Sequence, residues 1–152
     1  MLKVTIAGLI GIALTVFLHG VTTTVVIKFL KAYGPSWRRR MGDYFRSFVL
    51  MVSACMFTAK HLLDIGIWAI GFYWLAPNTV SGFEEALYFS AVTYTTVGYG
   101  DVVLEESTRL ISAFIAINGL LLFGWSGAML FVLVQRLWRT DADDDVLPIS
   151  YD

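Results

Sequence analysis

The sequence predicts an all-α membrane protein, with three transmembrane helices and one short re-entrant helix. Of its 152 residues, 57% are hydrophobic and 15% are charged, and the mean hydropathy is +0.70. A soluble domain of this size has too much surface for its volume to hide so much apolar area from water. Two stretches of 24 and 26 residues, 4–27 and 110–135, carry no formal charge. At a rise of about 1.5 Å per residue, each is long enough to cross a bilayer core of roughly 30 Å.

The composition also limits the partners of the chain. A lipid bilayer is the expected solvent, and a nucleic-acid-binding domain, a disordered tail and a disulfide-stapled secreted module are excluded. Cys55 is the only cysteine, so neither an intrachain disulfide nor a thiolate metal cluster can form. Because Cys55 lies in an apolar run, we expect a small core residue there.

The first transmembrane helix is expected within residues 1–31, followed by a basic cytoplasmic loop at 32–46. A signal peptide with Lys3 as its positive end is the alternative for the first segment. The apolar run is too long for a signal peptide, and no cleavage site of small residues follows it. An uncleaved helix is therefore favoured, and its small residues would allow close helix packing; these are Ala7, Gly8, Gly11 and Gly20.

The second transmembrane helix, predicted at 47–76, contains the unusual polar groups Lys60, His61 and Asp64. Ionisable groups at membrane depth are costly, so they should pair or face water. Lys60 and Asp64 are four residues apart and can pair along one helix face. Two interpretations stay open: a structural pair that joins helices within the subunit, or a proton-sensitive contact through His61, whose intrinsic pKa is about 6.5. His19 in the first helix is expected to be a buried, hydrogen-bonded histidine.

A short helix is predicted at 82–94, between the last two long segments. The S-x-x-E pattern of Ser81 to Glu84 is typical of a capping box at a helix start. The apolar run that follows is too short to span a membrane and fits a re-entrant helix. Such a helix must end in irregular backbone, which membranes tolerate only inside protein or beside a water-filled cavity.

Basic residues predict the orientation of the chain. Most of them lie at helix ends that would share one side of the membrane: Lys28, Lys31, Arg38, Arg39, Arg40, Arg46, Arg136 and Arg139. The positive-inside rule places this side in the cytoplasm. In a cell membrane the N-terminus would then lie outside, and the acidic tail at 139–152 would be cytoplasmic and solvated.

The segment at 95–101 is the candidate functional motif of the sequence. It reads Thr95-Thr96-Val97-Gly98-Tyr99-Gly100-Asp101. Two glycines spaced by one residue permit positive φ angles that other residues resist. With those angles, successive carbonyls from Thr96 to Tyr99 can turn to one side. Four such strands around an axis would form rings of oxygen that replace the water shell of a cation, and the Thr96 hydroxyl would add one more oxygen.

This motif, after a short aromatic helix and before a glycine-containing helix, resembles the potassium-channel pore domain over residues 62–138. The resemblance implies a homotetramer with a re-entrant pore helix, a filter at 95–101 and an inner helix at 109–138. It also implies passive, selective K⁺ transport, with K⁺ as the permeant ion, no organic cofactor and no small-molecule substrate.

The resemblance assigns roles to individual residues. The K⁺ filter would comprise Thr96, Val97, Gly98, Tyr99 and Gly100. Support for the filter would come from Thr95, Asp101, Tyr88 and Phe89, the last two matching an aromatic cuff. One position departs from the pattern of some bacterial members, because Val92 stands where they carry a glutamate that pairs with the external aspartate. Asp101 must therefore find another partner.

The inner helix carries one possible gating hinge and one lone polar residue. Gly119 lies near the hinge glycine of the family, and a close helix contact is the equal alternative. Asn118 is expected either to face the cavity or to bond a neighbouring helix. No helix carries arginines at every third position, which excludes a voltage sensor of the usual kind.

Two other functions were weighed against a conducting channel. The first is a non-conducting or weakly selective membrane subunit that keeps the filter motif. The second is an intramembrane enzyme that uses Lys60, His61 and Asp64. The sequence disfavours the enzyme, because it lacks a recognisable nucleophile or metal motif.

Overall fold

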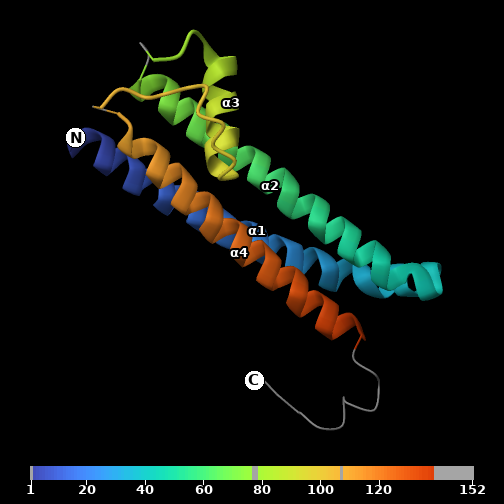
Figure 1. The fold of residues 1–152 in the computed structure, drawn as a ribbon. Coiled ribbons are helices and arrows are strands. Elements are labelled where there is room, and N and C mark those ends of the chain that lie inside the picture. The colour runs from blue at the N-terminus through green and yellow to red at the C-terminus, as the bar shows by residue number, and fades with distance from the viewer. Residues whose placement is uncertain (1, 77–78, 107, 139–152) are drawn as a thin grey trace.

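The computed structural model describes residues 2–76, 79–106 and 108–138, and these form helices and connecting turns (Figure 1). In chain order the helices are α1 (Leu2–Met41), a short 3₁₀ turn (Gly42–Tyr44), α2 (Phe45–Leu75), α3 (Phe83–Tyr94) and α4 (Leu110–Trp138). Two helical stretches are long and apolar enough to cross a membrane, Leu2–Leu75 and Leu110–Trp138. The all-α prediction is thus confirmed for the described part of the chain.

The segment at 32–46, expected as a loop, is largely helical. α1 continues to Met41, and the chain reverses only at the 3₁₀ turn, where Gly42 has a φ of +53°. Pro35 removes one helical N–H but does not end the helix. Lysine, leucine, alanine and arginine around it favour helix, and Arg38–Arg40 in the last turn offset the negative end of the helix dipole. Charge alone had suggested a loop.

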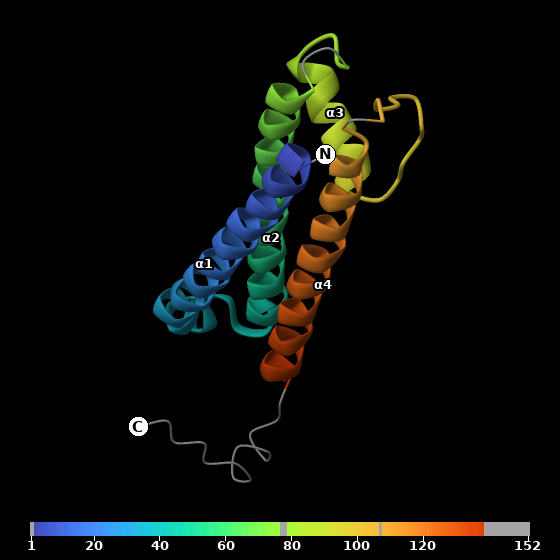
Figure 2. The same ribbon diagram turned by 90° about the vertical axis from the view of Figure 1, so that its left-hand side faces the viewer.

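α1, α2 and α4 lie side by side, and α3 packs against one end of this bundle (Figures 1 and 2). α1 contacts both α2 and α4, while α3 contacts α2 and α4. The predicted close packing of α1 occurs at two glycines. A Cβ on Gly8 would lie 2.3 Å from the Phe114 ring, and one on Gly11 would lie 2.7 Å from the Trp68 ring. Gly20 has no described atom that close, so it plays no such part.

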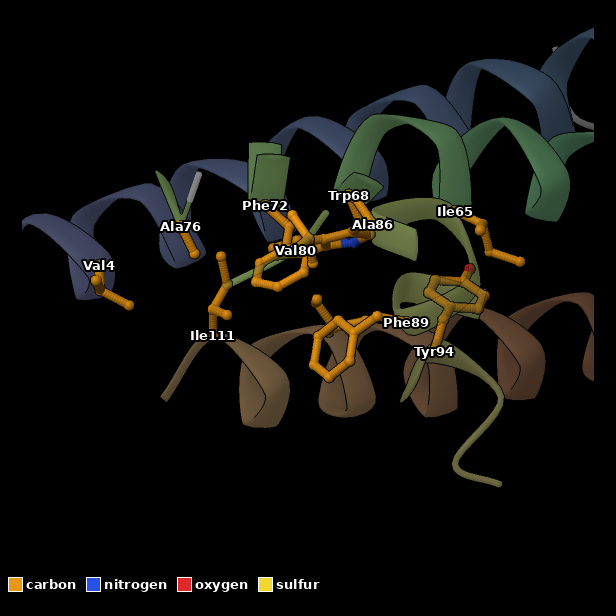
Figure 3. Close-up of a cluster of buried hydrophobic side chains, with 11 residues drawn as sticks. Val4, Ile65, Trp68, Phe72, Ala76, Val80, Ala86, Phe89, Tyr94 and Ile111 are labelled. Carbon is orange, nitrogen blue, oxygen red and sulfur yellow. The ribbon is translucent and has the colours of Figure 1, made fainter. Parts of the chain in front are cut away.

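The apolar core lies at the α3 end of the bundle (Figure 3). The rings of Phe72 on α2 and Phe89 on α3 contact each other there in a tilted arrangement, with centroids 4.6 Å apart. Ile111 and Ile115 close the cluster from α4. Apolar side chains elsewhere on the helices are exposed on the single chain, including Phe17, Leu62 and Leu120. Cys55 is also exposed, so the prediction of a core cysteine is wrong.

The start of α3 differs from the predicted capping box by one residue. Glu85, not Glu84, accepts hydrogen bonds from the Ser81 backbone N–H at 2.6 Å and from the Ser81 hydroxyl at 2.8 Å. The helix begins at Phe83 after an extended Gly82, so Ser81 precedes the N-cap and its partner lies one position further along. The backbone hydrogen bond from Ser81 lowers the pKa of the Glu85 carboxyl.

Candidate functional site

The filter segment continues directly from the C-terminal end of α3. Its first N–H groups bond to the last carbonyls of the helix: Thr95 to Ala91 at 3.0 Å, and Val97 to Val92 at 3.0 Å. The Thr95 hydroxyl also donates to the Ala91 carbonyl, at 2.8 Å. Free carbonyls normally remain at a helix end, and here the segment satisfies them itself. The start of the segment is therefore fixed relative to α3.

Left-handed backbone recurs at every second residue of the segment. Gly98 and Gly100 have φ angles of 58° and 79°, as the glycine spacing predicts, and Thr96 joins them at 60°. Val97 and Tyr99, between them, keep ordinary negative φ. Left-handed backbone is uncommon for a β-branched residue, so it was not expected at Thr96. This alternation is the pattern that lets successive carbonyls turn to the same side.

The side chains of the segment are open on the single chain. Val97 is 53% exposed and Tyr99 is 73% exposed. If the carbonyls of the segment turn to one side, these two side chains point away from that side. On the single chain, the described residues leave both of them largely uncovered.

Asp101 is held by Tyr88 of α3. The Tyr88 hydroxyl donates to Asp101 Oδ2 at 2.6 Å, and the Val102 N–H donates to Oδ1 at 3.1 Å. The hydrogen bond from Tyr88 keeps the pKa of the Asp101 carboxyl below its usual value. Because Val92 cannot pair with Asp101, the aspartate needs another partner, and that partner is Tyr88. The segment is tied to α3 at both of its ends.

A recess of about 610 Å³ lies behind the segment, between it, α3 and α4. Phe89 and Val92 line it from α3, and Ser112 and Ala116 line it from α4. Phe89 is buried against α2, so it supports α3 more directly than it supports the filter. Glu105 and Glu106 on the adjoining loop are exposed, as expected for a hydrated loop.

The three polar residues of α2 form one buried network. Lys60 pairs with Asp64, as their spacing predicts. His61 Nδ1 lies 3.0 Å from the Tyr94 hydroxyl on α3, and His61 Nε2 lies 3.0 Å from Ser126 Oγ on α4. The Tyr94 hydroxyl also reaches Asp64 Oδ2, at 3.4 Å. The network joins helices, as the structural interpretation expected, and sensitivity to protons stays a prediction.

α1 completes this network with His19. Its Nε2 lies 3.2 Å from Ser126 Oγ, and its ring stacks on Phe57 of α2 with centroids 5.7 Å apart. Sequence reasoning identified His19 and His61 separately but missed Tyr94 and Ser126. Tyr94 comes immediately before the paired threonines, and that position was the available signal.

Gly119 and Asn118 both act as contact points of α4. A Cβ on Gly119 would lie 1.9 Å from the Tyr94 carbonyl oxygen, so only glycine allows this approach. This contact favours close packing at Gly119, and α4 is one continuous helix through it. Asn118 Oδ1 accepts from the Thr15 hydroxyl at 3.0 Å and from Trp68 Nε1 at 2.8 Å. Asn118 therefore bonds neighbouring helices.

Comparison with known proteins places the sequence of this chain in a family. The family model described as "Ion channel" matches residues 60–136, just over half of the chain. The chain belongs to this ion-channel family, a family of membrane channels and not of enzymes. Two-pore potassium channel 1 from Arabidopsis thaliana is 43% identical over 51 residues, which is 33% of this chain and 14% of that channel. The predicted potassium-channel resemblance is confirmed, although the match spans a small part of the plant protein. No solved structure matches the chain.

Proposed function

We propose that the chain forms a K⁺-selective channel through which K⁺ passes passively down its electrochemical gradient. The observation that carries the proposal is the alternating left-handed backbone at Thr96, Gly98 and Gly100. Carbonyls aligned in this way can replace the hydration shell of a bare cation. The ion ligands would be the backbone oxygens of 96–100, with the Thr96 hydroxyl at the inner end.

The end of α3 adds a favourable field. α3 ends at Tyr94, where the segment begins, and the C-terminus of a helix carries partial negative charge. A cation that loses water near this end is therefore stabilised. Asp101, whose carboxylate accepts a hydrogen bond from Tyr88, would add negative charge at the outer mouth.

In this proposal the chain assembles as a homotetramer. One chain supplies a quarter of each carbonyl ring, and the exposed Val97 and Tyr99 need neighbours to pack against. In this proposal Leu2–Leu75 crosses the membrane twice, because α1 and α2 run antiparallel around the 3₁₀ turn (Figure 2). α4 is the third crossing, and α3 with the segment enters from the outer side of the cell membrane.

Flux into liposomes tests the proposal. Purified protein should carry K⁺ much faster than Na⁺, with block by barium, and cross-linking should give a four-chain band. Gly98→Ala should abolish selective flux, since an L side chain at a φ of 58° is strained. Gly82→Ala is the matched control, because its backbone is extended and no described atom crowds it. Equal K⁺ and Na⁺ flux, or a dimer, would contradict the proposal.

A further inference from the structure

The buried network meets the candidate filter at Tyr94. This residue is fully buried and is the last residue of α3, two positions before Thr96. Its hydroxyl is held by α2, through His61 and Asp64, and its carbonyl lies against Gly119 of α4. Residue 94 is therefore fixed at both its side chain and its backbone, directly ahead of the first left-handed residue.

The hydrogens of this network can be assigned from its geometry. The Ser126 hydroxyl donates its single proton to the Leu122 carbonyl at 3.1 Å. Both nearby imidazole Nε2 atoms must then donate to Ser126 Oγ. A neutral His61 with its proton on Nε2 leaves Nδ1 as an acceptor, and the Tyr94 hydroxyl donates to it.

The same assignment accounts for His19. With its proton on Nε2, His19 keeps a bare acceptor at Nδ1, and that atom has no hydrogen-bond partner among the described residues. Lys60 meanwhile supplies the charge that Asp64 requires. In this assignment the Tyr94 hydrogen points to His61 and both Nε2 hydrogens point to Ser126, while Asp64 Oδ2 lies 3.4 Å from the Tyr94 oxygen and Asp64 Oδ1 takes its hydrogen bond from Lys60.

We propose that His61 and Tyr94 are positioning residues for the filter, and this inference rests on the proposed function. Selectivity depends on how the carbonyl oxygens are placed around the ion, and that placement begins where the segment leaves α3. The His61–Tyr94 hydrogen bond fixes the rotation of the last turn of α3. Through Ser126 and His19, it also links the base of the filter to the inner helix and to α1. His19 lies outside the residues that the family model matches.

Tyr94→Phe is the sharpest test, because it removes one hydroxyl and keeps the ring. We expect the K⁺ to Na⁺ permeability ratio in liposomes to fall about threefold to tenfold, the effect of one lost hydrogen bond. His61→Leu should cause a similar fall. His61→Gln should keep the ratio close to that of the wild type, because an amide can accept from Tyr94 and donate to Ser126. Tyr73→Phe is the control, because it removes a tyrosine hydroxyl near the C-terminal end of α2, outside the network. It should leave the permeability ratio unchanged.

Cross-linking reports assembly in each variant, so a loss of tetramer is separated from a loss of selectivity. If His61→Leu does not assemble, the smaller change at Tyr94 decides the question. A wild-type ratio in assembled Tyr94→Phe overturns the inference, as does an equal loss in His61→Gln and His61→Leu. Wild-type protein that does not prefer K⁺ would instead overturn the proposed function.

Discussion

Single side chains hold both ends of the filter segment. At its outer end the Tyr88 phenol donates to Asp101, and at its inner end the Tyr94 phenol donates to His61. The two tyrosines differ in setting, because Tyr94 is buried in the bundle while Tyr88 is exposed on the single chain. The Tyr88–Asp101 contact influences the carboxylate charge at the outer mouth. The Tyr94–His61 contact influences the backbone whose carbonyls would bind the ions.

The pH dependence of conduction should report the Tyr88–Asp101 contact. Because the pKa of Asp101 is lowered in the folded chain, its carboxylate persists below the usual value and is lost as pH falls through the lowered pKa. Tyr88→Phe removes the largest cause of this shift. We therefore expect acid loss of K⁺ flux to begin at a higher pH in this variant.

The measurement is K⁺ flux from liposomes as the external pH is lowered from about 6 to about 3. Tyr44→Phe, in the 3₁₀ turn at the other end of the bundle, is the control. Superimposable curves for wild type and Tyr88→Phe would show that this hydrogen bond does not govern the charge at the mouth.

Among the helices, the tightest contact lies where α4 crosses the end of α3. The obstacle to a side chain at Gly119 is a backbone carbonyl, which cannot rotate aside as a flexible side chain would. α1 is joined to α4 and α2 through Asn118, which links Thr15 to Trp68. α1 is thus packed against the two long helices that hold α3.

Gly119→Ala should destabilise the assembled protein by about 1–3 kcal/mol, the usual cost of overpacking. Thermal unfolding in detergent would measure this as a lower transition temperature. Gly20→Ala on α1 is the matched control, and alanine there should be neutral or slightly favourable to the helix. An unchanged transition temperature in Gly119→Ala would mean that α3 and α4 separate easily.

The helices and the filter motif could be predicted because they depend on local patterns. Charge-free stretches mark α1 and α4, and the glycine spacing marks two of the three left-handed residues. Position 96 was not predicted, because a β-branched residue rarely adopts a positive φ and threonine gives no local signal for it. Nor was the His61–Tyr94–Ser126 path, because its members lie 33 and 65 residues from His61 and meet only through helix packing.

At the scale of the whole molecule, the single chain leaves much apolar surface open. Phe17 on α1, Trp74 on α2 and Phe131 on α4 are all exposed. In water this surface would be unfavourable, whereas lipid or neighbouring chains can cover it. The basic residues gather towards the end of the bundle opposite to α3, so the two ends differ in charge.

Labelling from one side of the membrane should reveal this orientation. In a Cys55→Ser background, Tyr44→Cys in the 3₁₀ turn and Val103→Cys in the loop after the filter both offer exposed positions. An impermeant maleimide added outside intact cells should label position 103 and spare position 44 until the cells are opened. Labelling of both positions from outside would contradict the predicted topology.

The length of α1 has a mechanical consequence. Its 40 residues extend over about 60 Å, roughly twice the depth of the oily layer. The half near the filter is anchored by Gly8, Thr15 and His19. Along the other half, the rings of Phe29, Tyr33 and Trp37 contact one another. That other half is not free, because Trp37 packs edge-on against Phe48 of α2 with ring centroids 5.1 Å apart. A displacement of this end of α1 would therefore be passed to α2 as well as to the contacts at Thr15 and His19.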